Sequence, residues 1–272
     1  MFPHPTSRRR LAAALFVLVL VARLPAGAER LTLPIADPAQ PVQLEVSLPN
    51  GSIEVVGSDT REVIVVFGEP DEVERGGQPE KVDGMYRIPN RGFGLTAEAD
   101  GNRVEVGGGW GDQLTVRIEV PRRTSMSLHS ISGDVMIVRN VEGDLELNCI
   151  NGDIEVRDVT GSVIAHSTNG DIEVVLTGLG ERKPMSFITF NGDIDVTFPA
   201  GFASDLRISS MQGEIYSDFE LVIEPTTAQV DRDAKGVRYR VEREIHATVG
   251  GGGEETRFKT FNGDVFLRRG AR

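Results

Sequence analysis

Residues Asn151-Gly152-Asp153-Ile154-Glu155-Val156 recur at two later places in the chain, unchanged at 169–174 and with one Glu-to-Asp difference at 191–196. A degenerate early copy lies at 50–55, and shorter variants surround three further glycines, Gly133, Gly213 and Gly263. Successive glycines from Gly133 to Gly213 are 19, 18, 22 and 21 residues apart, with weaker copies at the halfway points. One coil of about 20 residues therefore carries two turns and two short strands.

When the copies are aligned on this glycine, similar side chains recur at fixed positions. Two and four residues after the glycine they are nearly all aliphatic: Val135, Ile154, Ile172, Ile194, Ile215, Val265, then Ile137, Val156, Val174, Val196, Ser217, Leu267. Five residues before it they are apolar: Leu128, Leu147, Ala165, Phe187, Ile208, Phe258. Three residues before it they are small and mostly hydroxylic: Ser130, Cys149, Ser167, Thr189, Ser210, Thr260. Because alternate positions of a strand share a face, we expect all of these columns to point inward.

This pattern favours an all-β fold, a single-stranded, right-handed parallel β-helix or β-solenoid with coils of about 20 residues. Antiparallel hairpins in a β-sandwich are the alternative, since Asn-Gly is also a strong hairpin signal. In a solenoid each side chain stacks on its counterpart about 4.8 Å away. Antiparallel neighbours would give no reason for one column to be hydroxylic throughout. The right-handed winding follows the general rule for parallel crossovers.

The first 28 residues have the features of a secretory signal peptide. Three arginines at 8–10 precede an apolar run, Leu11–Val21, and Ala26-Gly27-Ala28 supplies a cleavage site after Ala28. The apolar run is too short to span a bilayer, which takes a helix of about 20 residues. We therefore expect an exported protein, periplasmic or at the cell surface. An uncleaved anchor stays an alternative, and the choice between Sec and twin-arginine export stays open.

The remaining residues, 29–272, are expected to form a single domain. Regular coils are predicted at about 125–220 and 255–268, and a strand-rich cap precedes them. The period is interrupted near the C-terminus by an insertion in which strands at 237–241 and 245–249 are expected to pair as a hairpin.

Charge excludes one class of partner. The chain has 29 Lys and Arg against 41 Asp and Glu, a formal net charge of −12. Because nucleic-acid-binding proteins need a basic surface, we expect no nucleic-acid partner. The single cysteine, Cys149, excludes an internal disulfide framework and fits the small-residue column as a packing residue.

Acidic residues follow the repeated glycines and form a candidate calcium ladder. Its members are Asp134, Asp153, Asp171, Asp193 and Asp264. Calcium takes several oxygen ligands, but calcium-binding repeats carry more glycines per turn than these coils do. We therefore favour corner aspartates that accept backbone N–H bonds, and expect no cofactor. His129 and His166 lie two coils apart, about 10 Å, too far to share a metal ion.

A polysaccharide-active β-helix enzyme is the main catalytic alternative. The outward column Glu155, Glu173 and Asp195 could supply the paired carboxylates that glycoside hydrolysis uses. Alternating charge is, however, what any exposed strand needs, and the chain has no Gly-x-Ser-x-Gly nucleophile elbow. We therefore expect a protein that is not an enzyme.

Three aromatic residues are candidates for a partner surface. Trp110 lies in a glycine-rich loop, where an exposed tryptophan can anchor a partner. Phe190 and Phe261, with Ile131 and Met211, stand two residues before the repeated glycine. They form either an exposed apolar ridge, which would bind a partner, or corner residues covered by a loop.

Several of these motifs together resemble the bacterial putative-adhesin domain of unknown function. They are the early copy at 50–55, the Val120-Pro121 corner, the Gly-Asp-Ile/Val coils and the closing 261–265 segment, spanning about 40–268. The resemblance implies a β-helical envelope protein and carries no defined site residues. We expect a non-catalytic scaffold that presents a sheet surface to an envelope protein or glycan. A self-associating component, or one active in envelope stress signalling, is the alternative.

Overall fold

The computed structural model describes residues 29–68, 81–82, 85–86, 94–109, 113–225, 229–233, 236–240 and 244–270. These residues form 22 strands and no helix, so none of them lies in a helix able to cross a membrane. The expected signal peptide at 1–28 and Trp110 lie outside the described residues.

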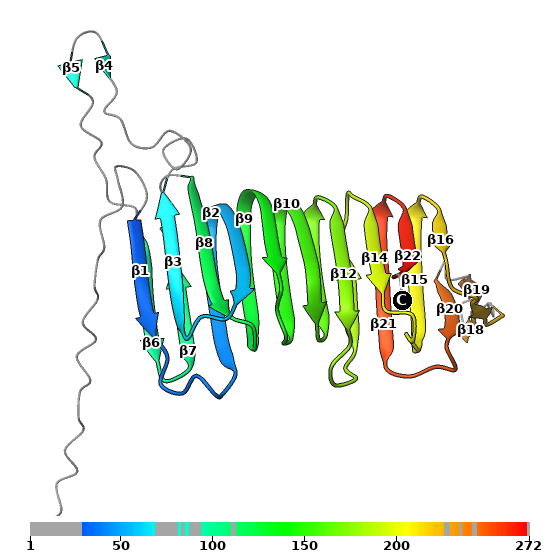
Figure 1. Ribbon diagram of the computed structural model, residues 1–272. Helices are drawn as coiled ribbons and strands as arrows, with labels where there is room; N and C mark the ends of the chain where they lie inside the picture. Colours follow the sequence, from blue (N-terminus) through cyan, green and yellow to red (C-terminus); the bar gives the residue numbers. More distant parts are fainter. Residues whose placement is uncertain are drawn as a thin grey trace, which may run out of the picture.

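The middle of the chain is a stack of coils whose strands pair in parallel with those one coil away (Figure 1). Its strands are β9 (Thr124–Arg139), β10 (Leu145–Thr160), β11 (Val163–Asn169), β12 (Ile172–Gly178), β13 (Met185–Ile188) and β14 (Ile194–Phe198). Leu147, for example, lies beside Leu128 in one direction and Ala165 in the other. The repeats therefore stack in parallel, as column identity predicts, and not as hairpins. The hand of the winding stays a prediction.

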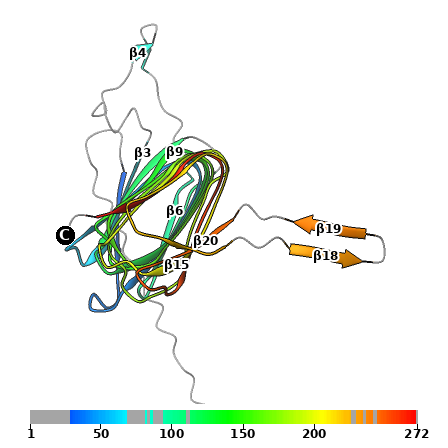
Figure 2. The same cartoon turned by 90° about the vertical axis from the view of Figure 1, so that its right-hand side faces the viewer.

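Each coil has a first strand segment ahead of its glycine and a second one after it, and the core lies between the two. Figure 2 looks along the stack and shows the coils superposed around this common interior. The column five residues before the glycine is at most 1% exposed in every coil. In the hydroxylic column, Thr189 Oγ1 donates to Gly170 O at 3.0 Å and Thr260 Oγ1 to Gly192 O at 3.0 Å. The column is mostly hydroxylic because each of its serine and threonine side chains donates to a glycine carbonyl of the neighbouring coil.

One column assignment is wrong in the coil around Gly133. Met136 and Val138 are buried there, and the expected core residues Val135 and Ile137 are turned outward and half-buried. The pairing of β9 with β10 shifts by one residue beside Asp153. This extra residue is a β-bulge, and because side chains alternate, it exchanges the two faces of the strand that follows.

The repeated glycine is required by close packing of successive corners. Gly170 has φ +150°, and a Cβ there would lie 2.2 Å from Gly152 O. Gly192 has φ +151° and would clash in the same way with Gly170 O. Glycine therefore stacks on glycine along this corner, since any side chain would displace the neighbouring backbone.

Coil order in space differs from coil order in sequence at the C-terminal end. Sequence order predicts that the coil around Gly213 follows the coil around Gly192. Instead β21 (Glu255–Asn262) and β22 (Val265–Arg269) lie between β13–β14 and the strands β15 (Ser204–Gln212) and β16 (Ile215–Ser217). The outer coil is then closed by β20 (Ile245–Val249), which pairs antiparallel with β15 and with β17 (Val222–Ile223). As part of the outermost coil, Ile215 is only half-buried and Ser217 is exposed, whereas both were expected in the core.

The N-terminal end is built in the same way. β2 (Val42–Ser58) lies between β9 on one side and β7 (Arg103–Gly107) and β8 (Leu114–Pro121) on the other. β3 (Glu62–Gly68) and β1 (Glu29–Pro34) extend beyond β8 as antiparallel strands, and β6 (Thr96–Asp100) pairs antiparallel with β7. Antiparallel strands thus end the parallel stack on both sides, which limits open sheet edges.

The insertion near the C-terminus does contain a hairpin, but its partners differ from those expected. β19 (Gly236–Arg240) pairs with β18 (Gln229–Asp233), whereas the expected partner, β20, belongs to the coil stack. Val241 lies outside the described residues. A further short pair is formed by β4 (Lys81–Val82) and β5 (Met85–Tyr86).

Candidate functional site

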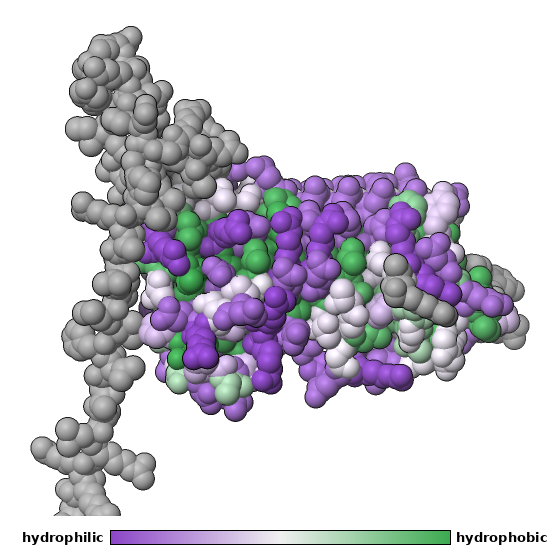
Figure 3. Space-filling model, viewed as in Figure 1, coloured by the Kyte–Doolittle hydropathy of each residue, from purple (hydrophilic) through white to green (hydrophobic). Residues whose placement is uncertain are grey.

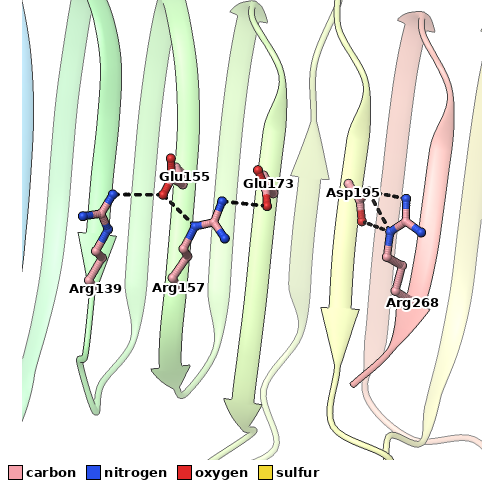
Figure 4. Close-up of polar contacts among 6 residues, drawn as sticks. All are labelled: Arg139, Glu155, Arg157, Glu173, Asp195 and Arg268. Carbon is pink, nitrogen blue, oxygen red and sulfur yellow. Dashed lines mark hydrogen bonds and ion pairs between the residues drawn. The ribbon is translucent and has the colours of Figure 1, made fainter. Parts of the chain in front are cut away.

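The second strand segments of the coils carry an ion-pair network, and we call this surface the charged face (Figure 4). Arg157 binds Glu155 at 2.7 Å and Glu173, one coil away, at 3.0 Å. Arg139 binds Glu155 from the other side at 3.1 Å. At the far end of the row, Arg268 reaches Asp195 at 2.7 Å.

These contacts favour the charged form of Glu155. Hydrogen bonds from Arg157, and then Arg139, hold the pKa of Glu155 below its usual range although burial opposes them. A general acid in glycoside hydrolysis needs the opposite, a raised pKa. The lowered pKa of Glu155 therefore does not suit it to the role of general acid, and Glu173 and Asp195 also pair with arginines.

The first strand segments form the opposite surface, which we call the grooved face because two hollows follow one another along β2, β9, β10 and β11. The first hollow has a volume of about 640 Å³. Ser125 and Ser127 of β9 lie in it between longer side chains, including Arg103 on one side and Lys183 on the other. The hollow exists because β9 contributes two small residues where its neighbours contribute large ones.

Ion pairs hold the two sides of this first hollow. Arg103 binds Glu45 at 2.7 Å and Glu105 at 2.6 Å. Lys183 Nζ binds Asp144 Oδ2 at 2.7 Å, and Ser162 Oγ donates to Asp144 Oδ1 at 2.6 Å. Burial acts to raise the pKa of Asp144, but the hydrogen bonds from Lys183 and Ser162 outweigh it and lower the pKa.

The second hollow, about 380 Å³, continues toward the glycine corner. Its outward column is His129, Asn148 and His166, one from each of three successive coils. A hydrogen bond of 2.9 Å joins His129 Nε2 to Ser127 Oγ, and one of 3.1 Å joins His166 Nε2 to Ser186 Oγ. Burial lowers the pKa of His166. The hollow therefore offers the neutral imidazole of His166 at neutral pH, together with amide and hydroxyl groups.

Of the two arrangements expected for the residues two positions before the glycine, the structure shows the exposed apolar ridge. Phe190 is 50% exposed, Met211 and Ile131 are also exposed, and Phe261 is half-buried. The rings of Phe190 and Phe261 stack with centroids 4.8 Å apart and planes 7° from parallel. Sequence reasoning missed Ile150, which is exposed in the same column and is found by the same alignment on the glycine.

The corner aspartates accept backbone N–H bonds, but from the next coil. Asp153 Oδ1 accepts from Asp171 N at 2.9 Å, Asp171 from Asp193 N at 2.8 Å, and Asp193 from Asp264 N at 2.8 Å. Asp134 is exposed in the bulged coil. Within the described part of the chain, no group of three or more His, Cys, Asp and Glu side chains could hold a metal ion.

An asparagine ladder runs beside these aspartates, and sequence reasoning did not identify it. Asn169 Nδ2 donates to Asn151 Oδ1, Asn191 to Asn169, and Asn262 to Asn191, at 2.8, 2.8 and 2.6 Å. Hydrophilic residues line much of the upper edge of the stack in Figure 3. The repeated Asn-Gly-Asp motif was the sequence signal of the asparagine ladder, since parallel stacking places identical amides at bonding distance.

Comparison with solved structures finds similar chains at low sequence identity. At 9% identity and a TM-score of 0.43, a crystal structure of a putative cell adhesion protein from Clostridium sporogenes covers 89% of this chain and all of its own. A putative adhesin from Bacteroides fragilis covers 91% of this chain and all of its own, at 10% identity and a TM-score of 0.41. A putative lipid binding protein from Parabacteroides distasonis, at 11% identity and a TM-score of 0.33, covers 91% of this chain and 98% of its own. No curated protein matches the chain.

The family model described as Toastrack DUF4097 matches residues 99–265, more than half of the sequence. The chain therefore belongs to the Toastrack DUF4097 family.

Proposed function

We propose that this protein is a non-catalytic module of the cell envelope that binds a protein or glycan partner through its grooved face. In this proposal, residues 1–28 direct export and are removed, and the mature chain is a rigid right-handed β-solenoid. The sheet serves as a platform and carries out no covalent chemistry.

The contrast between the two faces carries the proposal. On the charged face, arginines bridge carboxylates from coil to coil, so a partner would have to break these pairs to bind there. On the grooved face, two hollows follow one another across the same four strands. Binding sites are typically concave and hold a few polar groups on a rigid support, which describes the grooved face.

A matched pair of blocking variants tests this proposal. Ser127→Trp fills the floor of the first hollow, and Thr197→Trp places the same side chain outward on the charged face. Binding of the chain lacking residues 1–28 to an isolated envelope fraction is measured by co-sedimentation. We expect at least tenfold weaker binding for Ser127→Trp and less than a twofold change for Thr197→Trp. Equal binding by the two variants, or no binding by the unsubstituted chain, would overturn the proposal.

End-to-end self-association is a second candidate function, favoured by the C-terminal end of the stack. Val222 is 70% exposed and Ile223 is 61% exposed in β17. Two adjacent aliphatic side chains at this level of exposure are typical of a contact surface. Light scattering should show a mass that rises with concentration and falls back to one chain in Ile223→Lys. A constant single-chain mass would exclude this function.

A further inference from the structure

The apolar ridge contains a notch at Thr168. In spatial order the ridge is Ile131, Ile150, Thr168, Phe190, Phe261 and Met211. The backbone places the notch directly beside the aromatic pair, because Asn191 N donates to Thr168 O at 3.0 Å and Asn262 N to Phe190 O at 3.0 Å. Thr168 is the shortest side chain among these six residues, so the ridge is lower at that coil.

One ring face of Phe190 borders the notch. Phe261 covers the other face, with centroids 4.8 Å apart and nearly parallel planes. Rings that stack at the coil spacing of about 4.8 Å present their outer face to the next coil along, which carries Thr168. The 50% exposure of Phe190 agrees with one open face.

The dimensions of the notch suit a single six-membered ring. Phe190 and Ile150 are two coils apart, about 10 Å, on either side of Thr168. Carbon atoms in contact lie about 3.5 to 4.0 Å apart, so one ring inserted between the two side chains contacts both. Ile150 is 45% exposed and forms the second wall.

Polar groups lie on both sides of the notch. Asn151, Asn169 and Asn191 run along one side, and each carboxamide has a second N–H and a second lone pair beyond those used in the ladder. On the other side, Asn148 and His166 line the second hollow, as Thr168 itself does. A ligand held here therefore has apolar ring faces and a rim of hydrogen-bonding groups, which is the chemistry of a pyranose.

The charge of the surroundings narrows the choice of ligand further. Asp153, Asp171 and Asp193 follow the asparagines along the same corner, and the chain has a net charge of −12. Acidic polysaccharides would be repelled by this field. The surroundings therefore suit an uncharged sugar.

We propose that the notch at Thr168 binds one pyranose ring of a neutral glycan, packed between Phe190 and Ile150. The amides of the asparagine ladder bind the sugar hydroxyls on one side, and Asn148 and His166 bind them on the other. This inference rests on the proposed function and names the partner class of the grooved face.

Affinity electrophoresis tests this binding. The chain lacking residues 1–28 is run in native gels containing mannan, galactomannan, dextran or hydroxyethyl cellulose, with alginate as the acidic comparison. Thr168→Phe adds a third ring beside the stacked pair of Phe190 and Phe261 and fills the notch. Phe190→Ala removes one wall of the notch. The matched controls are Thr197→Phe and Phe266→Ala on the charged face, where Phe266 stacks with Tyr216 at 5.0 Å. The unfolding midpoint of each variant shows that it is folded.

We expect at least one neutral polysaccharide to retard the unsubstituted chain and alginate not to. Thr168→Phe and Phe190→Ala should weaken this binding at least tenfold, and the controls less than twofold. No retardation by any neutral polysaccharide, or undiminished binding by folded Thr168→Phe, would overturn the inference. If that happens while Ser127→Trp still blocks envelope binding, the proposed function stands and the partner is a protein. If both tests fail, the proposed function fails too.

Discussion

The charged face and the grooved face are made from the same coils, yet they use their outward side chains differently. On the charged face, Arg139 and Arg157 join Glu155 and Glu173 into a continuous row. On the grooved face, Ser127 and His129 bond to each other within one strand, and hollows remain between the coils. A repeat thus provides a rigid frame, and the residues between its core columns decide whether a face is closed by its own contacts or open to a partner.

Both faces depend on the glycine corner that joins them, so the largest effect is expected there. Gly170→Ala introduces a Cβ that lies 2.2 Å from Gly152 O at a φ of +150°. We expect a loss of about 3 kcal/mol in the free energy of unfolding, from backbone strain and displacement of the neighbouring coil. Urea denaturation measures it. Gly201→Ala is the control, because a Cβ there meets nothing within 4 Å; an equal cost for both variants would contradict stacking of the corners.

The hydroxylic column should matter less than the glycine corner and more than either face. Thr189→Val keeps the shape of a side chain that is 2% exposed but removes its bond to Gly170 O. Leaving the carbonyl without this donor should lower the free energy of unfolding by about 1 to 2 kcal/mol. The same substitution at the outward Thr197 should cost under about 0.5 kcal/mol. If the two substitutions cost the same in chemical denaturation, the hydroxyl ladder has no stabilising role.

The ion pairs of the charged face should make a smaller, pH-dependent contribution. Because the folded pKa of Glu155 lies below its unfolded value, its stabilisation is present above the ordinary glutamate pKa of about 4.3 and is lost as pH falls through the folded pKa. Glu155→Gln should therefore lower stability at neutral pH by about 1 kcal/mol or less. It should also flatten the acid limb of the stability curve. An unchanged acid limb would show that the network does not hold this carboxylate.

The smallest effect is expected from His166 on the grooved face, in a different pH range. Burial lowers its folded pKa, so the unfolded chain takes up a proton first and stability falls as pH drops below the ordinary histidine pKa of about 6.5. His166→Gln should remove this decline and leave the loss of stability below about pH 4.3 unchanged. Thermal unfolding between pH 7 and pH 5 measures it, and an identical slope in the variant would contradict burial of the imidazole.

The sequence predicted the parts of the fold that depend on one coil and its neighbour. Aligning the glycines identified the buried columns through Leu147 and Cys149, because stacked positions share one environment. It failed at Val135, where a one-residue bulge reverses the strand faces, and at the order of the last two coils. Which coil lies beside which depends on long-range pairing, and the coil around Gly263 carries the same motif as its neighbours wherever it inserts.

For the candidate site, the sequence identified the ridge but not the groove. Phe190 and Phe261 stood out because aromatic residues occupy an outward column, but their exposure depends on what covers the corner. The groove arises from Ser127 lying between larger residues of two other coils, and from Lys183 reaching Asp144, 39 positions away. Neither relation is local in the chain. Trp110 stays a prediction.

The claim that the grooved face meets the partner can be tested most directly by site-specific protection. Cysteine is introduced at one position in each of two variants, S127C on the grooved face and T197C on the charged face. The native Cys149 gives little background, because burial raises the pKa of its thiol. Thiol modification rates are then compared with and without the envelope fraction. The account predicts at least tenfold slower modification of S127C and no change for T197C; protection of T197C, or equal rates for S127C in both conditions, would contradict it.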